Sequence, residues 1–245
     1  MRVRNYFIIA LAVACGASCK KVVSIITPAP TSSLTVVNAL DGSNGFLTTF
    51  WHDSAVATFY STGTEINYAS STEYSVPSGT SPVLIYDLSD TAEPLFSGNL
   101  TFQPKAIYSL FVSGALTVHS VPDTLLVQDD PPYHPVGDST VGIRFVNVSP
   151  DAGTISVDIK GNSPGSEVTS LGYQGVSAFK NYAATSAIPT PSVGYVFEFR
   201  VASTDSVLCT YTYRGNSIPR FKNVSLVVAG TVVGSGIRVF EVNNY

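Results

Sequence analysis

Charged residues are scarce in this sequence, making up 12% of its 245 residues. Basic residues are particularly few, because 13 lysines and arginines stand against 17 aspartates and glutamates, for a formal net charge of -4. Proteins bind nucleic acids largely through Lys and Arg side chains that displace counterions from the phosphates. This balance therefore argues against a DNA- or RNA-binding protein. Disorder is also disfavoured, because 44% of the residues are hydrophobic and a disordered chain needs low hydrophobicity.

Histidine and cysteine are rare as well, with three residues of each. None of them stands in HExxH, HxH or CxxC spacing, and no glycine-rich phosphate loop is present. The sequence therefore predicts neither a metal ion nor another cofactor.

A catalytic site is also poorly supported. His52, Asp53 and Ser54 supply the side chains of a hydrolase triad, but in three successive positions. Triads are assembled across a fold, and neighbours on a strand point to opposite faces. We therefore predict that the protein is not an enzyme. An envelope hydrolase stays an alternative, which a pocket bringing His52 or His119 against a serine and a carboxylate would favour.

No hydrophobic run is long enough to span a membrane, and the longest one lies near the N-terminus. Residues 1–18 begin with Arg2 and Arg4, continue with an apolar stretch from Tyr6 to Ala14, and end in small residues. This order is typical of a signal peptide. A membrane-spanning helix needs about 20 apolar residues, roughly twice the length of this stretch. We expect residues 1–18 to be removed.

The small residues lead into Cys19, an arrangement that resembles a bacterial lipobox, in which the cysteine is acylated before cleavage in front of it. Cys15 is a competing position, but the two lysines after Cys19 favour the latter, since that order is common in lipoproteins of the Bacteroidetes. The resemblance implies lipid attachment at Cys19 and a place in the outer membrane, on its periplasmic or surface face. Several acyl chains anchor a protein stably. Residues 19–33, rich in Pro, Ser and Thr, then predict an extended tether.

After residue 33 the sequence has short β-branched and aromatic runs, separated by Gly, Pro, Ser and Asn, and no long stretch of helical period. This pattern predicts an all-β fold built of sandwiches or barrels. The expected strands lie at residues 34–40, 55–60, 82–88, 95–102, 107–113, 124–128, 141–148, 154–160, 195–202, 207–213, 224–229 and 237–243.

The two halves of this region repeat each other. Asn38 in LTVVNAL corresponds to Asn147 in RFVNVS, and Gly114 after a strand-like run corresponds to Gly230 after another. Each copy is long enough to bury its own core. The sequence therefore predicts two tandem β-sandwich domains, at residues 34–128 and 141–245. The segment 129–140 contains three prolines and predicts an extended linker between two independent units.

The second copy carries the run IRFVNVSPDA at 143–152, then VDIKG at 157–161 and YQGVSAF at 173–179. These residues resemble the bacterial family called domain of unknown function 4397, with the best match over 141–232 and a divergent copy at 34–128. The resemblance implies immunoglobulin-like sandwiches on secreted or lipid-anchored proteins, and no established activity. A cation ringed by Asn147, Asp151 and Asp158 has suitable oxygen chemistry but lacks a recognisable loop spacing.

Five of the eleven aspartates are followed by Ser or Thr and then a small or aliphatic residue, where composition alone predicts about one. This pattern resembles the O-glycosylation sequon of Bacteroidetes envelope proteins. The alternative is that Asp-Ser and Asp-Thr pairs simply form turns. The hydroxyls that the resemblance nominates belong to Ser54, Thr91, Thr124, Ser139 and Ser206.

The strand expected at 207–213 places Cys209, Tyr211 and Tyr213 on one face. An exposed tyrosine face could stack on sugar rings or on a partner protein, but a core position is the favoured interpretation. Cys209 is accordingly predicted to be a small apolar residue rather than a reactive thiol.

Together these features predict a lipid-anchored cell-envelope protein with a non-catalytic binding or structural role. A carbohydrate-binding accessory of a glycan-uptake or adhesion system is an alternative, and a passive stalk is another. The expected partners are the membrane, through the lipid anchor, and a glycan or an envelope protein, with no nucleic acid.

Overall fold

The computed structural model describes residues 30–49, 65–116, 121–135, 137–184, 194–213 and 222–244. They form strands and connecting loops, and none of them belongs to a helix that could cross a membrane. The expected signal peptide, Cys19, most of the tether and the strand expected at 55–60 lie outside the described residues.

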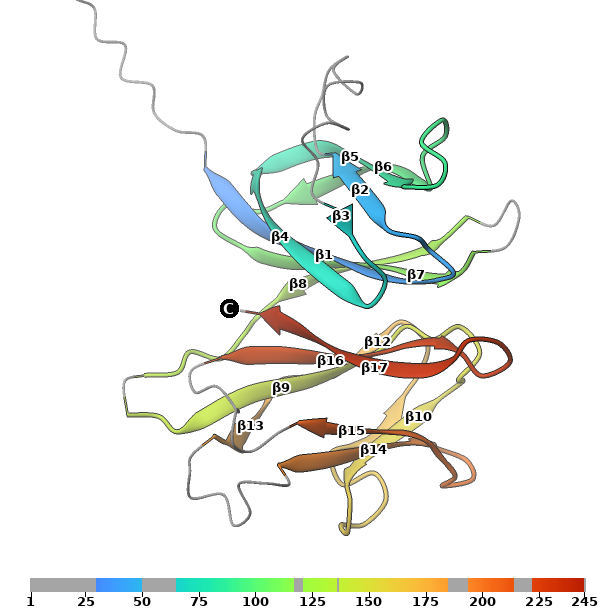
Figure 1. Ribbon diagram of the computed structural model, residues 1–245. Helices are drawn as coiled ribbons and strands as arrows, with labels where there is room; N and C mark the ends of the chain where they lie inside the picture. Colours follow the sequence, from blue (N-terminus) through green and yellow to red (C-terminus); the bar gives the residue numbers. More distant parts are fainter. Residues whose placement is uncertain are drawn as a thin grey trace, which may run out of the picture.

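The first half of the chain folds into two four-stranded sheets packed face to face (Figure 1). One sheet has the order β4-β1-β7-β8 and the other the order β3-β2-β5-β6. The strands are β1 (Thr31–Asp41), β2 (Phe46–Thr49), β3 (Glu65–Ile66), β4 (Ser70–Pro77), β5 (Gly79–Asp87), β6 (Phe96–Phe102), β7 (Ile107–Ala115) and β8 (Asp123–Asp129). Leu34, Phe46, Ile85, Phe102 and Leu110 are among the buried residues that fill the space between the sheets.

The second half repeats this arrangement. Its sheets have the orders β12-β9-β16-β17, with β13 also pairing with β9, and β11-β10-β14-β15. The strands are β9 (Thr140–Asn147), β10 (Ile155–Ile159), β11 (Val168–Leu171), β12 (Gly175–Val176), β13 (Lys180–Ala183), β14 (Tyr195–Val201), β15 (Val207–Tyr213), β16 (Asn223–Thr231) and β17 (Gly236–Asn244). Phe145, Phe197, Phe199 and Leu226 lie in its core. The protein is therefore an all-β protein of sandwiches.

The two asparagines that marked the repeat occupy equivalent positions. Each lies on the first strand of its sandwich, which pairs in parallel with the penultimate strand. Asn38 Nδ2 donates to the Ile66 carbonyl at 3.0 Å, and Asn147 Nδ2 donates to the Leu171 carbonyl at 3.1 Å. Each side-chain oxygen accepts a hydrogen bond from the backbone nitrogen two residues on. Each asparagine thus ties the end of its strand to the opposite sheet.

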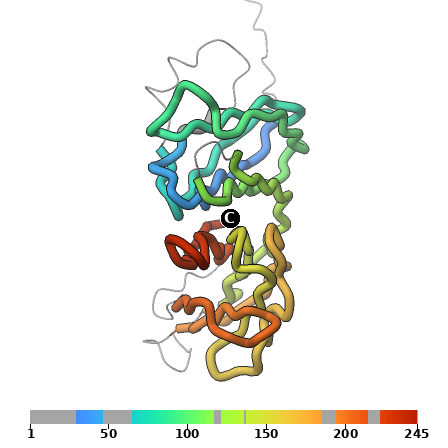
Figure 2. The backbone as a smooth tube through the Cα atoms, turned by 90° about the vertical axis from the view of Figure 1, so that its right-hand side faces the viewer, coloured from blue at the N-terminus to red at the C-terminus, as the bar shows by residue number. Residues whose placement is uncertain are grey.

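The two sandwiches share a third core. Val37, Ala39 and Phe111 point away from the first sandwich and pack against Val146, Val148, Val227, Ala229, Phe240 and Val242 of the second. The sheets containing β1 and β9 are therefore buried on both faces, and the molecule is a stack of four layers, as Figures 1 and 2 show from two directions. This differs from the expectation of two independent units on an extended linker, because apolar residues alternate onto both sides of the central strands.

Candidate functional site

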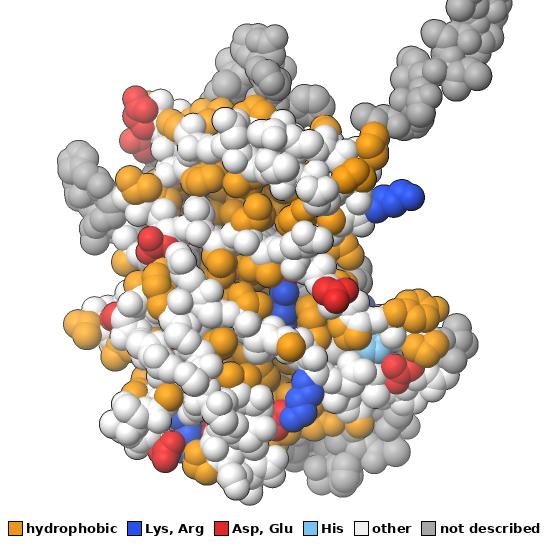
Figure 3. All heavy atoms as spheres, turned by 180° about the vertical axis from the view of Figure 1, so that it is seen from behind, with side chains coloured by type: hydrophobic (Ala, Val, Ile, Leu, Met, Phe, Trp, Pro, Cys, Tyr) orange, Lys and Arg blue, Asp and Glu red, His pale blue; other side chains and the backbone are white. Residues whose placement is uncertain are grey.

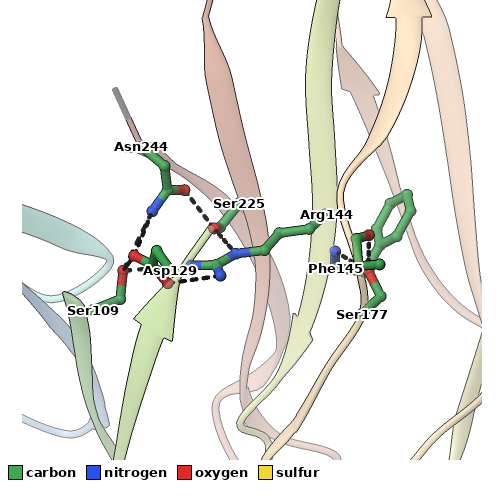
Figure 4. A network of polar contacts seen from close by, with 8 residues as sticks. Ser109, Asp129, Arg144, Phe145, Ser177, Ser225 and Asn244 are labelled. Atoms are coloured by element: carbon green, nitrogen blue, oxygen red, sulfur yellow. Dashed lines mark hydrogen bonds and ion pairs between the residues drawn. The ribbon is translucent and has the colours of Figure 1, made fainter. Parts of the chain in front are cut away.

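A network of polar side chains lies buried between the two sandwiches (Figure 4). Arg144 of β9 forms an ion pair with Asp129 at the end of β8, with Nη1 and Oδ1 2.7 Å apart and side-chain exposures of 3% and 0%. Arg144 Nε also donates to Ser225 Oγ at 2.7 Å, and Ser109 Oγ donates to Asp129 Oδ2 at 2.6 Å. Asn244 Nδ2 reaches Ser109 Oγ at 3.2 Å. Each charge is thus paired and hydrogen-bonded, as burial requires.

Further polar contacts join the sandwiches away from this network. Asp41 Oδ2 accepts hydrogen bonds from Thr231 Oγ1 at 3.1 Å and from Ser235 Oγ at 2.6 Å. Tyr173 OH donates to Asp123 Oδ2 at 2.6 Å. Burial, together with this bond to a carboxylate, raises the pKa of Tyr173 to about 12, so the phenol stays a donor at neutral pH. These contacts fix the orientation of one sandwich on the other.

The segment between the sandwiches is anchored through His134. Its Nδ1 lies 3.0 Å from Asp138 Oδ2, and its Nε2 lies 3.1 Å from Asn223 Oδ1. Asn223 Nδ2 in turn donates to the Pro132 carbonyl at 3.0 Å, which leaves its oxygen to face the histidine. Because an amide oxygen only accepts, His134 Nε2 is the donor in the contact with Asn223. The segment predicted to be a free linker is therefore held against β16.

Replacing Asp138 with asparagine is expected to destabilise the protein at pH 7 and to matter less as the pH falls. The hydrogen bond from His134, followed by one from Thr140, lowers the pKa of Asp138. A lowered folded pKa contributes stability above the ordinary aspartate pKa of about 4, and that stability is lost as the pH falls through the folded value. Urea unfolding of the wild type and of Asp138→Asn between pH 7 and pH 2 measures the difference between their free energies of unfolding.

Asp130→Asn is the matched control for this titration, because Asp130 is an exposed linker carboxyl without a side-chain hydrogen bond to any described residue. It is expected to follow the wild type at every pH. A stability gap for Asp138→Asn that stays constant from pH 7 to pH 2 would contradict the assigned contact.

The arrangement around His134 does not form a hydrolytic site. Both ring nitrogens are engaged, and the side chain is almost fully buried. A general base needs a free nitrogen within reach of the nucleophile. His52, Asp53, Ser54 and His119, from which the hydrolase alternative was built, lie outside the described residues.

The side chains proposed to ring a cation are engaged in other contacts. Asn147 donates to the carbonyls of Gly153 and Leu171, as a strand-end brace. Asp151 accepts hydrogen bonds from two backbone nitrogens of the β16–β17 turn. Asp158 lies on β10, with Oδ1 2.9 Å from Arg200 Nε. Among the described residues, no three His, Cys, Asp or Glu side chains gather into a group that could hold a metal ion.

The face of β15 that carries Tyr213 packs into the second sandwich. Tyr213 is buried, and Cys209 and Tyr211 are partly buried against the same core. The core interpretation of this face is therefore confirmed, and it offers no exposed tyrosine platform. Burial raises the pKa of the Cys209 thiol to about 11.

Cys209 is expected to react about 100-fold more slowly with a thiol reagent at pH 8 in the folded protein than in the unfolded chain, because thiolate formation is suppressed. Ellman's reagent, with and without 8 M urea as the denaturant, measures this on the chain from residue 19 carrying Cys19→Ser, which leaves Cys209 as its single cysteine. Equal rates in both conditions would contradict the buried position.

The nominated glycosylation residues lie in different surroundings. Thr91 and Ser206 are exposed, Thr124 and Ser139 are partly buried, and Ser54 lies outside the described residues. Ser206 Oγ also lies 2.7 Å from Thr204 Oγ1. Glycan attachment itself stays a prediction.

An open groove of about 590 Å³ lies beside the anchored segment. Tyr133 and Phe179 supply its aromatic rings, and Asp130 and Asn181 its polar groups, while Pro131, Pro132 and Ala178 complete the lining. In Figure 3 hydrophobic side chains gather beside the pale blue histidine near the junction of the two lobes. Sequence reasoning missed this groove because it treated 129–140 as a spacer. The signal available in the sequence was Tyr133 in the run PPYHP, an aromatic residue among prolines.

This geometry defines a class of protein: an all-β protein of four layers, in which the central sheets are buried on both faces. The sequence matches the family described as "Domain of unknown function (DUF4397)" over residues 31–158, more than half of its length. The chain therefore belongs to this family. The match covers the whole first sandwich and ends in β10, so the placement of the best match at 141–232, with 34–128 as the divergent copy, was wrong.

No curated protein sequence matches the chain. Several solved structures are similar to it, and the two named here have low scores. A candidate adhesin from Bacteroides ovatus is 11% identical, with a TM-score of 0.24, covering 88% of this chain and 96% of the other. The Bacillus anthracis TIE protein is 9% identical, with a TM-score of 0.22, covering 87% of this chain and 44% of the other. Likeness at this level carries no argument about function.

Proposed function

We propose that this protein is a lipid-anchored, non-catalytic component of the bacterial cell envelope, which holds a rigid binding body off the membrane. The observation that carries the proposal is the double-sided burial of the central sheets. Since Val37, Phe111 and Val227 pack in one shared cluster, the sandwiches cannot pivot without exposing apolar surface. A rigid body presents its surfaces in a constant arrangement relative to one another.

The position of β1 suits attachment through the N-terminal tether. β1 begins at Thr31 and pairs with both neighbours, β4 in antiparallel and β7 in parallel orientation. Tension applied through the preceding segment acts along β1, so that many ladder hydrogen bonds share it. The attachment end is thus the central strand of a doubly covered sheet.

The chemistry of the described residues favours binding over catalysis. The described histidine is fully engaged, and the described acidic residues form no metal-binding group. The buried Arg144–Asp129 pair is closed off by its own hydrogen bonds and joins the sandwiches rather than facing a substrate.

Lipid labelling of the full chain in a Gram-negative host tests the anchor. The wild type is expected to incorporate an alkyne-tagged fatty acid and to fractionate with membranes, whereas Cys19→Ser is expected to lose both properties. Cys15→Ser is the matched control and is expected to behave as the wild type. An unlabelled wild-type protein in the soluble fraction would overturn the proposal, and loss of label only in Cys15→Ser would move the anchor to that residue.

A further inference from the structure

We propose that the groove lined by Tyr133, Phe179, Asp130 and Asn181 binds an uncharged glycan, with a sugar ring stacked on the aromatic side chains. This inference rests on the proposed binding role and names its ligand class. The groove lies at the junction of the two sandwiches, where the anchored segment meets β13.

Tyr133 is presented to solvent by a backbone that cannot move freely. The residue is 86% exposed. The residues on both sides of it are held, because the Pro132 carbonyl accepts a hydrogen bond from Asn223 and His134 is held at both ring nitrogens. An aromatic ring kept in water on a fixed backbone is already placed for stacking, so binding loses little conformational freedom.

Phe179 is fixed from inside the protein. The guanidinium carbon of Arg144 lies 4.7 Å from the centre of its ring. Arg144 is itself held by the buried carboxylate of Asp129. The stacked cation orients the ring and leaves it partly exposed toward the groove. The interface network therefore supports the binding surface as well as the joint between sandwiches.

The polar groups of the groove suit vicinal hydroxyls. Asp130 and Asn181 are exposed, and neither side chain forms a hydrogen bond with another described residue. A carboxylate accepts, and a carboxamide both donates and accepts, which matches the hydroxyls of a sugar. No Lys or Arg is among the lining residues, so a phosphate or a nucleic acid would find no counter-charge there.

Another groove on the described surface provides a contrast. It is lined by β1, β4 and the start of β7, with Glu73 and Lys105 among its polar residues. Its carboxylate is already engaged, because Ser33 Oγ donates to Glu73. We expect no glycan to bind in this groove, so its residue Lys105 provides a control substitution.

Saturation-transfer difference NMR tests the proposal on the chain from residue 19 carrying Cys19→Ser. The probes are tetrasaccharides of cellulose, xylan, mannan and chitin. At least one is expected to receive saturation. Tyr133→Ala and Asp130→Asn are each expected to weaken its binding about tenfold, since one stacking contact or one charge-assisted hydrogen bond is lost. Tyr133→Phe, which keeps the ring, and the control Lys105→Ala are expected to bind as the wild type.

Failure of all four probes to bind would overturn the glycan proposal, and unchanged binding in Tyr133→Ala would place the ligand elsewhere. Both results are distinguishable from failure of the proposed envelope role, because lipid labelling at Cys19 reports on that role separately. Circular dichroism of each variant checks that these exposed substitutions leave the fold intact.

Discussion

Replacing Arg144 with methionine is expected to lower the free energy of unfolding by about 3–5 kcal/mol, because it leaves the carboxylate of Asp129 buried without a counter-charge. Asp129 is fully buried, and its remaining hydrogen bonds come from the neutral groups of Ser109 and Asn244. Urea unfolding followed by circular dichroism measures the change. The dependence of the free energy of unfolding on urea concentration is compared between the variants.

Two comparisons separate the lost charge from lost packing. The double substitution Asp129→Leu with Arg144→Met removes both charges and is expected to recover a large part of the loss. Lys160→Ala, which removes an exposed lysine that forms no ion pair with a described residue, is expected to change the free energy of unfolding by about 0.5 kcal/mol or less. A loss below about 1 kcal/mol for Arg144→Met would show that Asp129 reaches water or another cation, against the buried geometry.

Replacing Phe111 with alanine is expected to cost about 3–5 kcal/mol, because it opens a cavity in the cluster shared by the two sandwiches. Phe111 is fully buried and projects from β7 toward the second sandwich. Loss of the Phe111 side chain weakens the coupling between the two sandwiches as well as the packing of the cluster. We expect the wild type to unfold in one cooperative transition and the variant to unfold in two, one for each sandwich.

Differential scanning calorimetry measures both effects of this substitution. Phe111→Leu is the matched control, because it keeps most of the buried volume, and it is expected to retain a single transition. Two transitions in the wild type, or a single unshifted transition in Phe111→Ala, would contradict a shared core.

Strands rich in β-branched and aromatic residues could be predicted from the sequence, and those with polar compositions could not. The strand expected at 207–213 coincides with β15, and that expected at 107–113 lies within β7. β4, with the sequence SSTEYSVP, was missed. It is an edge strand that pairs with β1 along its whole length, so neighbouring strands rather than its own side chains determine its conformation.

β2 and β3, which are four and two residues long, were missed as well. The missed strands β11, β12 and β13 are four, two and four residues long. So short a segment carries too little periodicity to be recognised. β12 and β13 pair with β9, which lies before β10 and β11 in the sequence, so only the folded chain brings them together.

The interface between the sandwiches had a signal that the prediction did not use. Both Leu34 to Leu40 and Val224 to Ala229 are almost continuously apolar, and such runs are typical of strands covered on both faces. A sandwich standing alone would show polar residues at alternate positions. The Asp129–Arg144 pair could not be foreseen, because sequence distance does not reveal which charges are buried together.

The shared third core has a consequence for any fragment of this protein. If the chain were cut within 129–140 and the two halves separated, each half would expose an apolar outer sheet. Val37 and Phe111 on one half, and Val227 and Val242 on the other, would lose the residues against which they pack. We expect such halves to associate with one another and with further copies of themselves. A single cut in this segment would thus make the protein prone to aggregate.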